Sequence, residues 1–132
     1  MTRRGSCRVR HTASTSAMLA ALAALLFTCA VQAAATIYPD VARADADIAA
    51  GLRDAAVTNR RVLVDFGGNW CPDCIVLDHH FHTAENAELL KKHYILVHVN
   101  VGDKGITDSF AIAERYGIAL KKGVPALAVL EP

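Results

Sequence analysis

The feature that most constrains this chain is the stretch from Val62 to Cys74, in which an apolar run leads through two glycines to a pair of cysteines. The run Val-Leu-Val-Asp-Phe has little polar alternation, so it predicts a strand covered on both faces, as in the centre of a parallel sheet. Pro72, between the cysteines, suits the first turn of a helix, where a missing N–H group costs nothing. The stretch therefore predicts a buried strand that carries a dithiol to the start of a helix.

The first 35 residues are typical of an export signal. Four arginines and no acid precede an uninterrupted apolar or small run from Ala17 to Val31, and small residues follow at a cleavage site. The apolar run is too short to span a bilayer comfortably. We expect residues 1–35 to be a signal peptide, residues 36–132 to be the folded domain, and the protein to be exported to the periplasm. An uncleaved N-terminal membrane anchor and a lipid-modified Cys29 stay open as alternatives.

Cleavage changes the cysteine inventory more than the charge. Loss of the four arginines leaves 10 of the 14 basic residues against 13 acids, a balance that gives no indication of a nucleic-acid partner. Cys7 and Cys29 leave with the signal, so only Cys71 and Cys74 remain. Cysteines this close together cannot staple distant loops, as they do in disulfide-framed scaffolds. We therefore expect the dithiol to be chemical rather than structural.

The rest of the domain alternates predicted helices and strands. A loop over residues 36–42 precedes a helix over 45–59, whose apolar residues recur at helical spacing. Beyond the dithiol helix, which extends to Phe81, the pattern predicts a short helix or a continuation over 86–93, a strand over 94–101, a helix over 108–116, a basic loop over 120–123 and a strand over 126–130. This order predicts an α/β domain with a parallel core.

Three motifs in this order resemble the thioredoxin superfamily: the Val-Asp-Phe strand, Trp70–Cys74 at a helix start, and Gly123–Pro125 before the last strand. The resemblance covers Asp45 to Leu130 and is closest to exported thioredoxin-like domains. It implies a thioredoxin-like fold with a central mixed sheet flanked by helices. That fold normally continues with an edge strand and a final helix. We therefore expect a C-terminally truncated domain with an exposed sheet edge, an uncovered apolar face and marginal stability.

The resemblance also implies thiol:disulfide oxidoreductase activity on disulfide-containing protein substrates, with no cofactor. Cys71 would be the nucleophile, because a helix N-terminus lowers the pKa of a thiol, and Cys74 would resolve the mixed disulfide. The family implies that Asp65, the third expected catalytic residue, relays the proton of Cys74. The alternative for Asp65 is a strand acid that points into solvent at a sheet edge.

The expected substrate-binding residues surround the dithiol in this resemblance. Pro125 matches the family's cis-proline, and Val124 matches the residue before it, whose backbone pairs with an extended substrate. Trp70 and Pro72 would flank the nucleophile and shape the contact surface. Ordinary packing is the alternative role for Trp70, and the sequence does not separate the two.

Redox direction and competing functions rest on weaker signals. Asp73 beside the nucleophile opposes the thiolate, which favours a reductase or exchange protein over a strong oxidant. The resemblance to exported domains, including those of membrane thiol:disulfide transporters, makes such a transporter a candidate electron donor. A zinc or copper site could combine the cysteines with two of His79, His80 and His82, although the spacing from Cys74 is too short for a finger. A non-catalytic thioredoxin-like adaptor is the third class, which the intact dithiol disfavours.

Overall fold

A computed structural model describes residues 36–132, and the predicted signal peptide with Cys7 and Cys29 lies outside the described residues. At its centre is a three-stranded sheet in the order β2-β1-β3. β1 (Arg61–Gly67) pairs in parallel with β2 (Tyr94–Asn100) and antiparallel with β3 (Ala126–Leu130). This is the mixed sheet that the resemblance implies. The parallel core predicted from the order of elements holds only for β1 and β2.

The link between β2 and β3, over residues 101–125, contains no helix long enough to run back along the sheet. Its helix, α5 (Phe110–Arg115), has 6 residues, which extend only about 9 Å. The chain therefore stays at the end of the sheet where β2 finishes, and β3 starts there, with Ala126 opposite Phe66. The expected helix over 108–116 is shorter because Ser109, with φ 62°, takes a left-handed conformation just before it.

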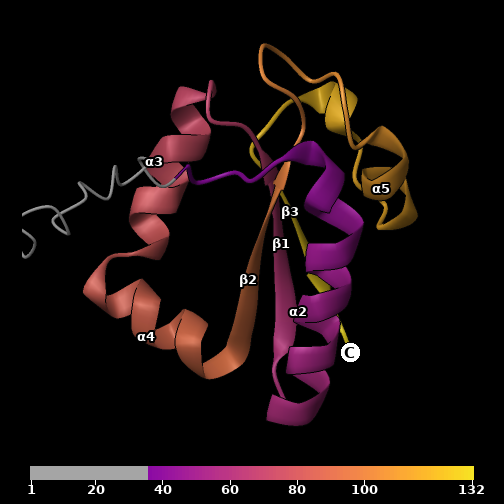
Figure 1. Ribbon diagram of the computed structural model, residues 1–132. Helices are drawn as coiled ribbons and strands as arrows, with labels where there is room; N and C mark the ends of the chain where they lie inside the picture. The colour runs from indigo at the N-terminus through magenta and orange to yellow at the C-terminus, as the bar shows by residue number, and fades with distance from the viewer. Residues whose placement is uncertain (1–35) are drawn as a thin grey trace, which may run out of the picture. The chain divides into compact units, whose positions relative to one another are not determined.

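Helices cover the two faces of the sheet, with α2 and α5 on one side and α3 and α4 on the other (Figure 1). α2 (Ala44–Thr58) follows a single 3-10 turn, η1 (Val41–Arg43), and α3 (Pro72–Phe81) and α4 (Ala84–His93) are separate helices. The expected basic loop contains a second such turn, η2 (Leu120–Lys122). Within residues 36–132, no helix has the length and apolar character needed to cross a membrane.

The α2 face of the sheet holds the apolar core. β1 contributes Val62, Val64 and Phe66, which are completely buried, and β2 contributes Val97 and Val99. Buried side chains of α2, α5, η2 and β3 complete this cluster: Ala44, Ile48, Ala55, Ala113, Leu120 and Ala128. The alternation along β1 therefore sends every second residue into one continuous core.

The α3 face is different in chemistry. β1 presents Leu63 and Asp65 on this side, and His98 of β2 lies opposite Asp65 in the register. On β3, Leu127 and Val129 are 43% and 49% exposed, and among residues 36–132 no strand pairs with the outer edge of β3. The expected sheet edge and partly uncovered apolar face are thus confirmed for the described residues.

Candidate functional site

The two cysteines form a disulfide where β1 passes into α3. Cys71 is the N-cap residue of α3, and its sulfur accepts a hydrogen bond from the backbone N–H of Cys74 at 3.2 Å. Pro72 occupies the first helical turn, as predicted. Cys71 is 5% exposed and Cys74 is 0% exposed, so the expected nucleophile is the more accessible sulfur by a narrow margin. A helix N-terminus also stabilises negative charge on the first sulfur.

A cis peptide bond joins Val124 to Pro125, as the resemblance implies. The carbonyl oxygen of Val124 lies 3.9 Å from the Sγ atom of Cys71. Val124 also packs against a buried cluster that contains both cysteines and Tyr38. The backbone before the cis-proline thus borders the more accessible sulfur of the disulfide.

Trp70, immediately before the disulfide, is 37% exposed. Its indole N–H donates a hydrogen bond to the carbonyl oxygen of Gly102, which fixes the ring against the loop after β2. A Cβ atom at Gly68 would lie 2.5 Å from the indole nitrogen, so this position needs glycine. Trp70 is therefore both packed and partly open to solvent, so the two roles considered for it are compatible.

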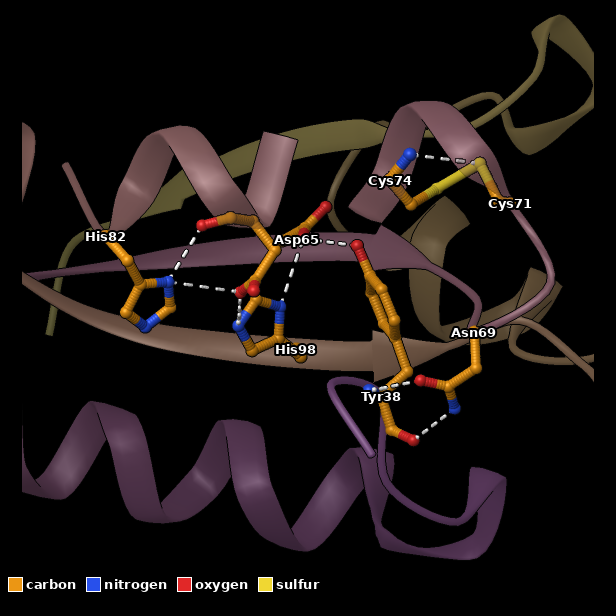
Figure 2. A network of polar contacts seen from close by, with 8 residues as sticks. Tyr38, Asp65, Asn69, Cys71, Cys74, His82 and His98 are labelled. Carbon is orange, nitrogen blue, oxygen red and sulfur yellow. Dashed lines mark hydrogen bonds and ion pairs between the residues drawn. A yellow bond between two sulfur atoms is a disulfide. The ribbon is translucent and has the colours of Figure 1, made fainter. Parts of the chain in front are cut away.

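Asp65 is completely buried in the middle of β1, so the alternative of a solvent-exposed strand acid is wrong. Its Oδ2 atom accepts a hydrogen bond from the Tyr38 hydroxyl at 2.6 Å and lies 3.0 Å from Nδ1 of His98 (Figure 2). Its Oδ1 atom is also buried and has no hydrogen-bond partner within the described part of the chain. A buried carboxylate oxygen without a donor is costly, which marks this atom as a feature that needs a functional explanation.

Tyr38 comes from the segment before η1, where the sequence indicates only a loop. The side chain of Asn69 pairs with the Tyr38 backbone in both directions, accepting from its N–H at 3.1 Å and donating to its carbonyl at 2.8 Å. The amide of Asn100 donates to the carbonyl of Pro39 at 2.8 Å. These bonds anchor the segment over the end of the sheet that carries the disulfide.

The phenol of Tyr38 is held as a neutral donor. Burial raises the pKa of Tyr38 far above its ordinary value, and the hydrogen bond to Asp65 and the charges of Asp65 and Asp78 act in the same direction. A Cβ atom at Gly67 would collide with this ring. The glycine at the end of β1 therefore makes room for the tyrosine that contacts Asp65.

Polar contacts continue from His98 to the protein surface. Its Nε2 atom lies 3.4 Å from Oδ1 of Asp78 on α3, and the same oxygen lies 3.6 Å from Nδ1 of His82. The nearest partner of this His82 nitrogen is the backbone carbonyl oxygen of Asp78, at 2.8 Å. The His82 side chain is 67% exposed. Of the three histidines singled out in the sequence, only His82 joins this network, while the rings of His79 and His80 lie against each other.

The described residues give no support to the metal-binding alternative. Between Thr36 and Pro132, no group of three or more histidine, cysteine and acidic side chains is arranged to hold a metal ion. The two cysteine sulfurs are bonded to each other in this structure. The histidines of α3 therefore do not complete a ligand set with the dithiol.

Sequence reasoning missed Tyr38, His98 and Asp78. A signal for His98 was present, because Asp65 and His98 are each the fifth residue of a strand in a parallel pair. The first residues of the two strands are paired, so the fifth residues are paired as well and their side chains lie on the same face of the sheet. No comparable pattern indicated Tyr38, which lies outside the helices and strands.

Residues 42–132 match a family model described as thioredoxin-like. This chain belongs to the thioredoxin-like family. Among solved structures, the thioredoxin-like domain is similar to a disulphide isomerase from Xylella fastidiosa Temecula1, with 29% sequence identity and a TM-score of 0.68. The similarity covers 75% of this chain and 74% of that chain. None of the curated proteins compared with the chain matches it.

Proposed function

We propose that this protein is a thiol:disulfide oxidoreductase that exchanges disulfides with protein substrates. The observation that carries the proposal is the Cys71–Cys74 disulfide at the N-terminus of α3, with the Val124 carbonyl 3.9 Å from the Cys71 sulfur. Similarity to a structure described as a disulphide isomerase supports the same chemistry. An adaptor role has no need of a paired dithiol at this position.

The reaction follows from the placement of the two sulfurs. In the reduced protein, the Cys71 thiolate attacks a substrate disulfide, forms a mixed disulfide and releases one substrate thiol. Cys74 loses its proton, attacks the Cys71 sulfur and releases the second substrate thiol. The substrate disulfide gains two electrons, and the protein is left with the Cys71–Cys74 disulfide seen in this structure. We propose Asp65 as the group that accepts the proton of Cys74.

Substrate is proposed to bind over the sulfur of Cys71. The backbone of Val124, before cis-Pro125, would pair with an extended segment of the substrate. Trp70 and the exposed ring of Pro72 would border this segment. The exposed side chain of Ile75, 44% accessible, adds an apolar contact on α3.

We propose that the protein works in the reducing direction. Asp73, exposed in the first turn of α3, places a negative charge near the Cys71 sulfur and destabilises its thiolate. A less stable thiolate makes the dithiol a better reductant. Equilibration with glutathione tests the direction: Asp73→Asn is expected to make the protein more oxidising, and an unchanged potential would remove this argument.

The compartment and the electron donor are proposals from the sequence. Residues 1–35 would direct export to the periplasm, and a membrane thiol:disulfide transporter would reduce the Cys71–Cys74 disulfide. Fractionation of cells that produce the full chain tests the location. A membrane-bound product would instead favour an uncleaved anchor or a lipid on Cys29.

Insulin reduction by dithiothreitol tests the proposed activity. The parent is expected to accelerate the turbidity that follows insulin reduction, whereas Cys71→Ser should give the uncatalysed rate. His79→Gln is a matched control, because His79 is exposed on the same helix and is outside the network around Asp65. Equal turbidity rates for the parent and Cys71→Ser would contradict the proposed function.

A further inference from the structure

We propose that Asp65 exchanges protons with solvent through a fixed series of side chains, named here the Asp65 chain: Tyr38, Asp65, His98, Asp78 and His82. In this chain Tyr38 and His98 are positioning residues that hold one oxygen of Asp65 and leave the other for the proton of Cys74. The side chains beyond His98 lead this proton to the surface. The inference rests on the proposed function, because only a dithiol that reacts needs such a route.

The inner part of the chain assigns different roles to the two oxygens of Asp65. Oδ2 is occupied from two directions, by the Tyr38 hydroxyl at 2.6 Å and the His98 ring at 3.0 Å. Oδ1 is buried and has no partner among the described residues. Tyr38 packs in one buried cluster with both cysteines, and Figure 2 shows its hydroxyl directed at Asp65. The carboxylate therefore keeps a free, desolvated acceptor while its other oxygen is fixed in place.

The outer part of the chain reaches solvent through His98. Its two ring nitrogens each face a carboxylate oxygen, Asp65 Oδ2 at 3.0 Å and Asp78 Oδ1 at 3.4 Å. An imidazolium donates to both oxygens, whereas a neutral ring donates to one. A proton taken at one nitrogen can thus leave from the other. The side chain of Asp65 is 0% exposed, those of His98 and Asp78 are 17% and 16% exposed, and that of His82 is 67% exposed.

Other groups near His98 either are apolar or are already paired. The Tyr38 and Phe81 rings lie 5.2 and 6.4 Å from the His98 ring, centroid to centroid. The shallow groove beside His98 is also lined by Arg43 and Asp47, which form an ion pair at 2.8 Å on η1 and α2. The charged side chains that line this groove among the described residues are therefore already paired with each other.

The Asp65 chain supplies a proton when the Cys71–Cys74 disulfide is reduced. A dithiol reductant attacks Cys71, the S–S bond breaks and Cys74 leaves with the bonding electron pair. Asp65, protonated on Oδ1, gives this proton to the Cys74 sulfur and takes another on Oδ2 from the His98 ring. The second thiol of the reductant then displaces Cys71, so that the reductant is oxidised by two electrons. In the opposite direction, Cys74 gives its proton to Oδ1, and the proton on Oδ2 passes to the His98 ring.

The test is the pH dependence of reduction by dithiothreitol, followed in stopped flow. Trp70 is the only tryptophan of the chain and adjoins Cys71, so its fluorescence reports the state of the disulfide. Rates are divided by the thiolate fraction of the reductant at each pH. His98→Gln and Tyr38→Phe are compared with the parent, and His79→Gln, exposed on α3, is the control.

His98→Gln is expected to slow the corrected rate about tenfold, and imidazole added to the buffer should restore it. The loss of rate should grow as pH rises, because the variant depends on protons from solvent in place of His98. Tyr38→Phe should slow the corrected rate without a response to imidazole, since its route through His98 is intact. A merely structural role would lower the rate equally at every pH.

A parent-like pH profile for His98→Gln, with no response to imidazole, would overturn the inference. If that variant fails to fold, Asp78→Asn replaces it, because the Asp78 side chain lies near the surface at 16% exposure. It should show the same response to imidazole, and parent-like behaviour would again overturn the inference. Insulin reduction by Cys71→Ser separates the two proposals. If Cys71→Ser is inactive while His98→Gln and Asp78→Asn match the parent, only the route through His98 fails.

Discussion

On the α2 side of β1, Val62, Val64 and Phe66 are completely buried in an apolar core, whereas on the α3 side the same strand presents Leu63 and Asp65. The α3 side carries the disulfide, a buried carboxylate with an unpartnered oxygen, and apolar β3 residues that stay partly exposed. Alternate residues of β1 thus point to two faces of the sheet that differ in chemistry. The α2 face stabilises the domain, and the α3 face keeps groups that are costly to bury but useful for proton and thiol chemistry.

The largest expected effect is on stability, at the centre of the α2 face. Phe66→Ala should lower the free energy of unfolding by about 3–5 kcal/mol, because the ring is fully buried and its loss leaves a cavity. Urea unfolding measures the change. Val57→Ala is the control, since Val57 is 84% exposed on α2 and should change stability by less than about 0.5 kcal/mol. A loss below about 1 kcal/mol at Phe66 would contradict the role given to this face.

Asp65→Asn should show the opposite pattern on the α3 face. The amide can still accept from the Tyr38 hydroxyl but is a far weaker base than a carboxylate. Insulin reduction should slow by about 10- to 100-fold, while the free energy of unfolding changes by less than about 1.5 kcal/mol. Activity and urea unfolding are measured on the same preparation. A variant that keeps its activity would show that Asp65 is structural.

Tyr38→Phe should have a smaller effect that depends on pH. At neutral pH the loss of the hydrogen bond to the Asp65 carboxylate should cost about 1–2 kcal/mol of stability. The pKa of Tyr38 is raised in the folded state, so its stabilisation is complete below the ordinary tyrosine value and is lost as pH rises above about 10. The free energy of unfolding, measured from pH 8 to 11, should therefore fall more steeply for the parent than for the variant. Parallel curves would contradict this prediction.

The smallest expected effect is at Val129 on β3, and the same substitution in the α2 core serves as its comparison. Val129→Thr, at a position 49% exposed on β3, should change stability by less than about 0.5 kcal/mol. Val64→Thr places a hydroxyl in the fully buried α2 core and should cost about 1–3 kcal/mol. Thermal or urea unfolding of the two variants compares the faces directly. Equal losses would show that the exposed β3 face is covered in solution.

Much of the fold was predictable from local patterns. The apolar run of β1, the glycines and Pro72 together specify a strand, a turn and a helix start, and the structure has all three there. The cis bond at Pro125 came from family resemblance, because the physics of a Val-Pro bond alone favours trans. The direction of β3 depends on the length of α5, which the sequence pattern overestimated.

Local patterns alone predicted the site only along the contiguous motif, whereas Val124 and Pro125 were expected from the family resemblance. Cys71 and Cys74 stand in one short stretch, whereas the contacts of Asp65 come from Tyr38 and His98, 27 and 33 residues away. Such contacts depend on strand register and on a loop anchored by Asn69, and neither is encoded in hydrophobic periodicity. Partners of a buried acid are found by asking which residues share its level in the sheet.

The central claim is that Cys71 attacks and Cys74 resolves, and trapping of the mixed disulfide tests it most directly. Reduced Cys74→Ser is incubated with a disulfide-containing protein such as insulin, and the product is analysed by mass spectrometry without reductant. The account predicts a stable adduct through Cys71, because no second thiol is present to release it, and no adduct with Cys71→Ser. A stable adduct that forms only through Cys74, or none with either variant, would contradict the account.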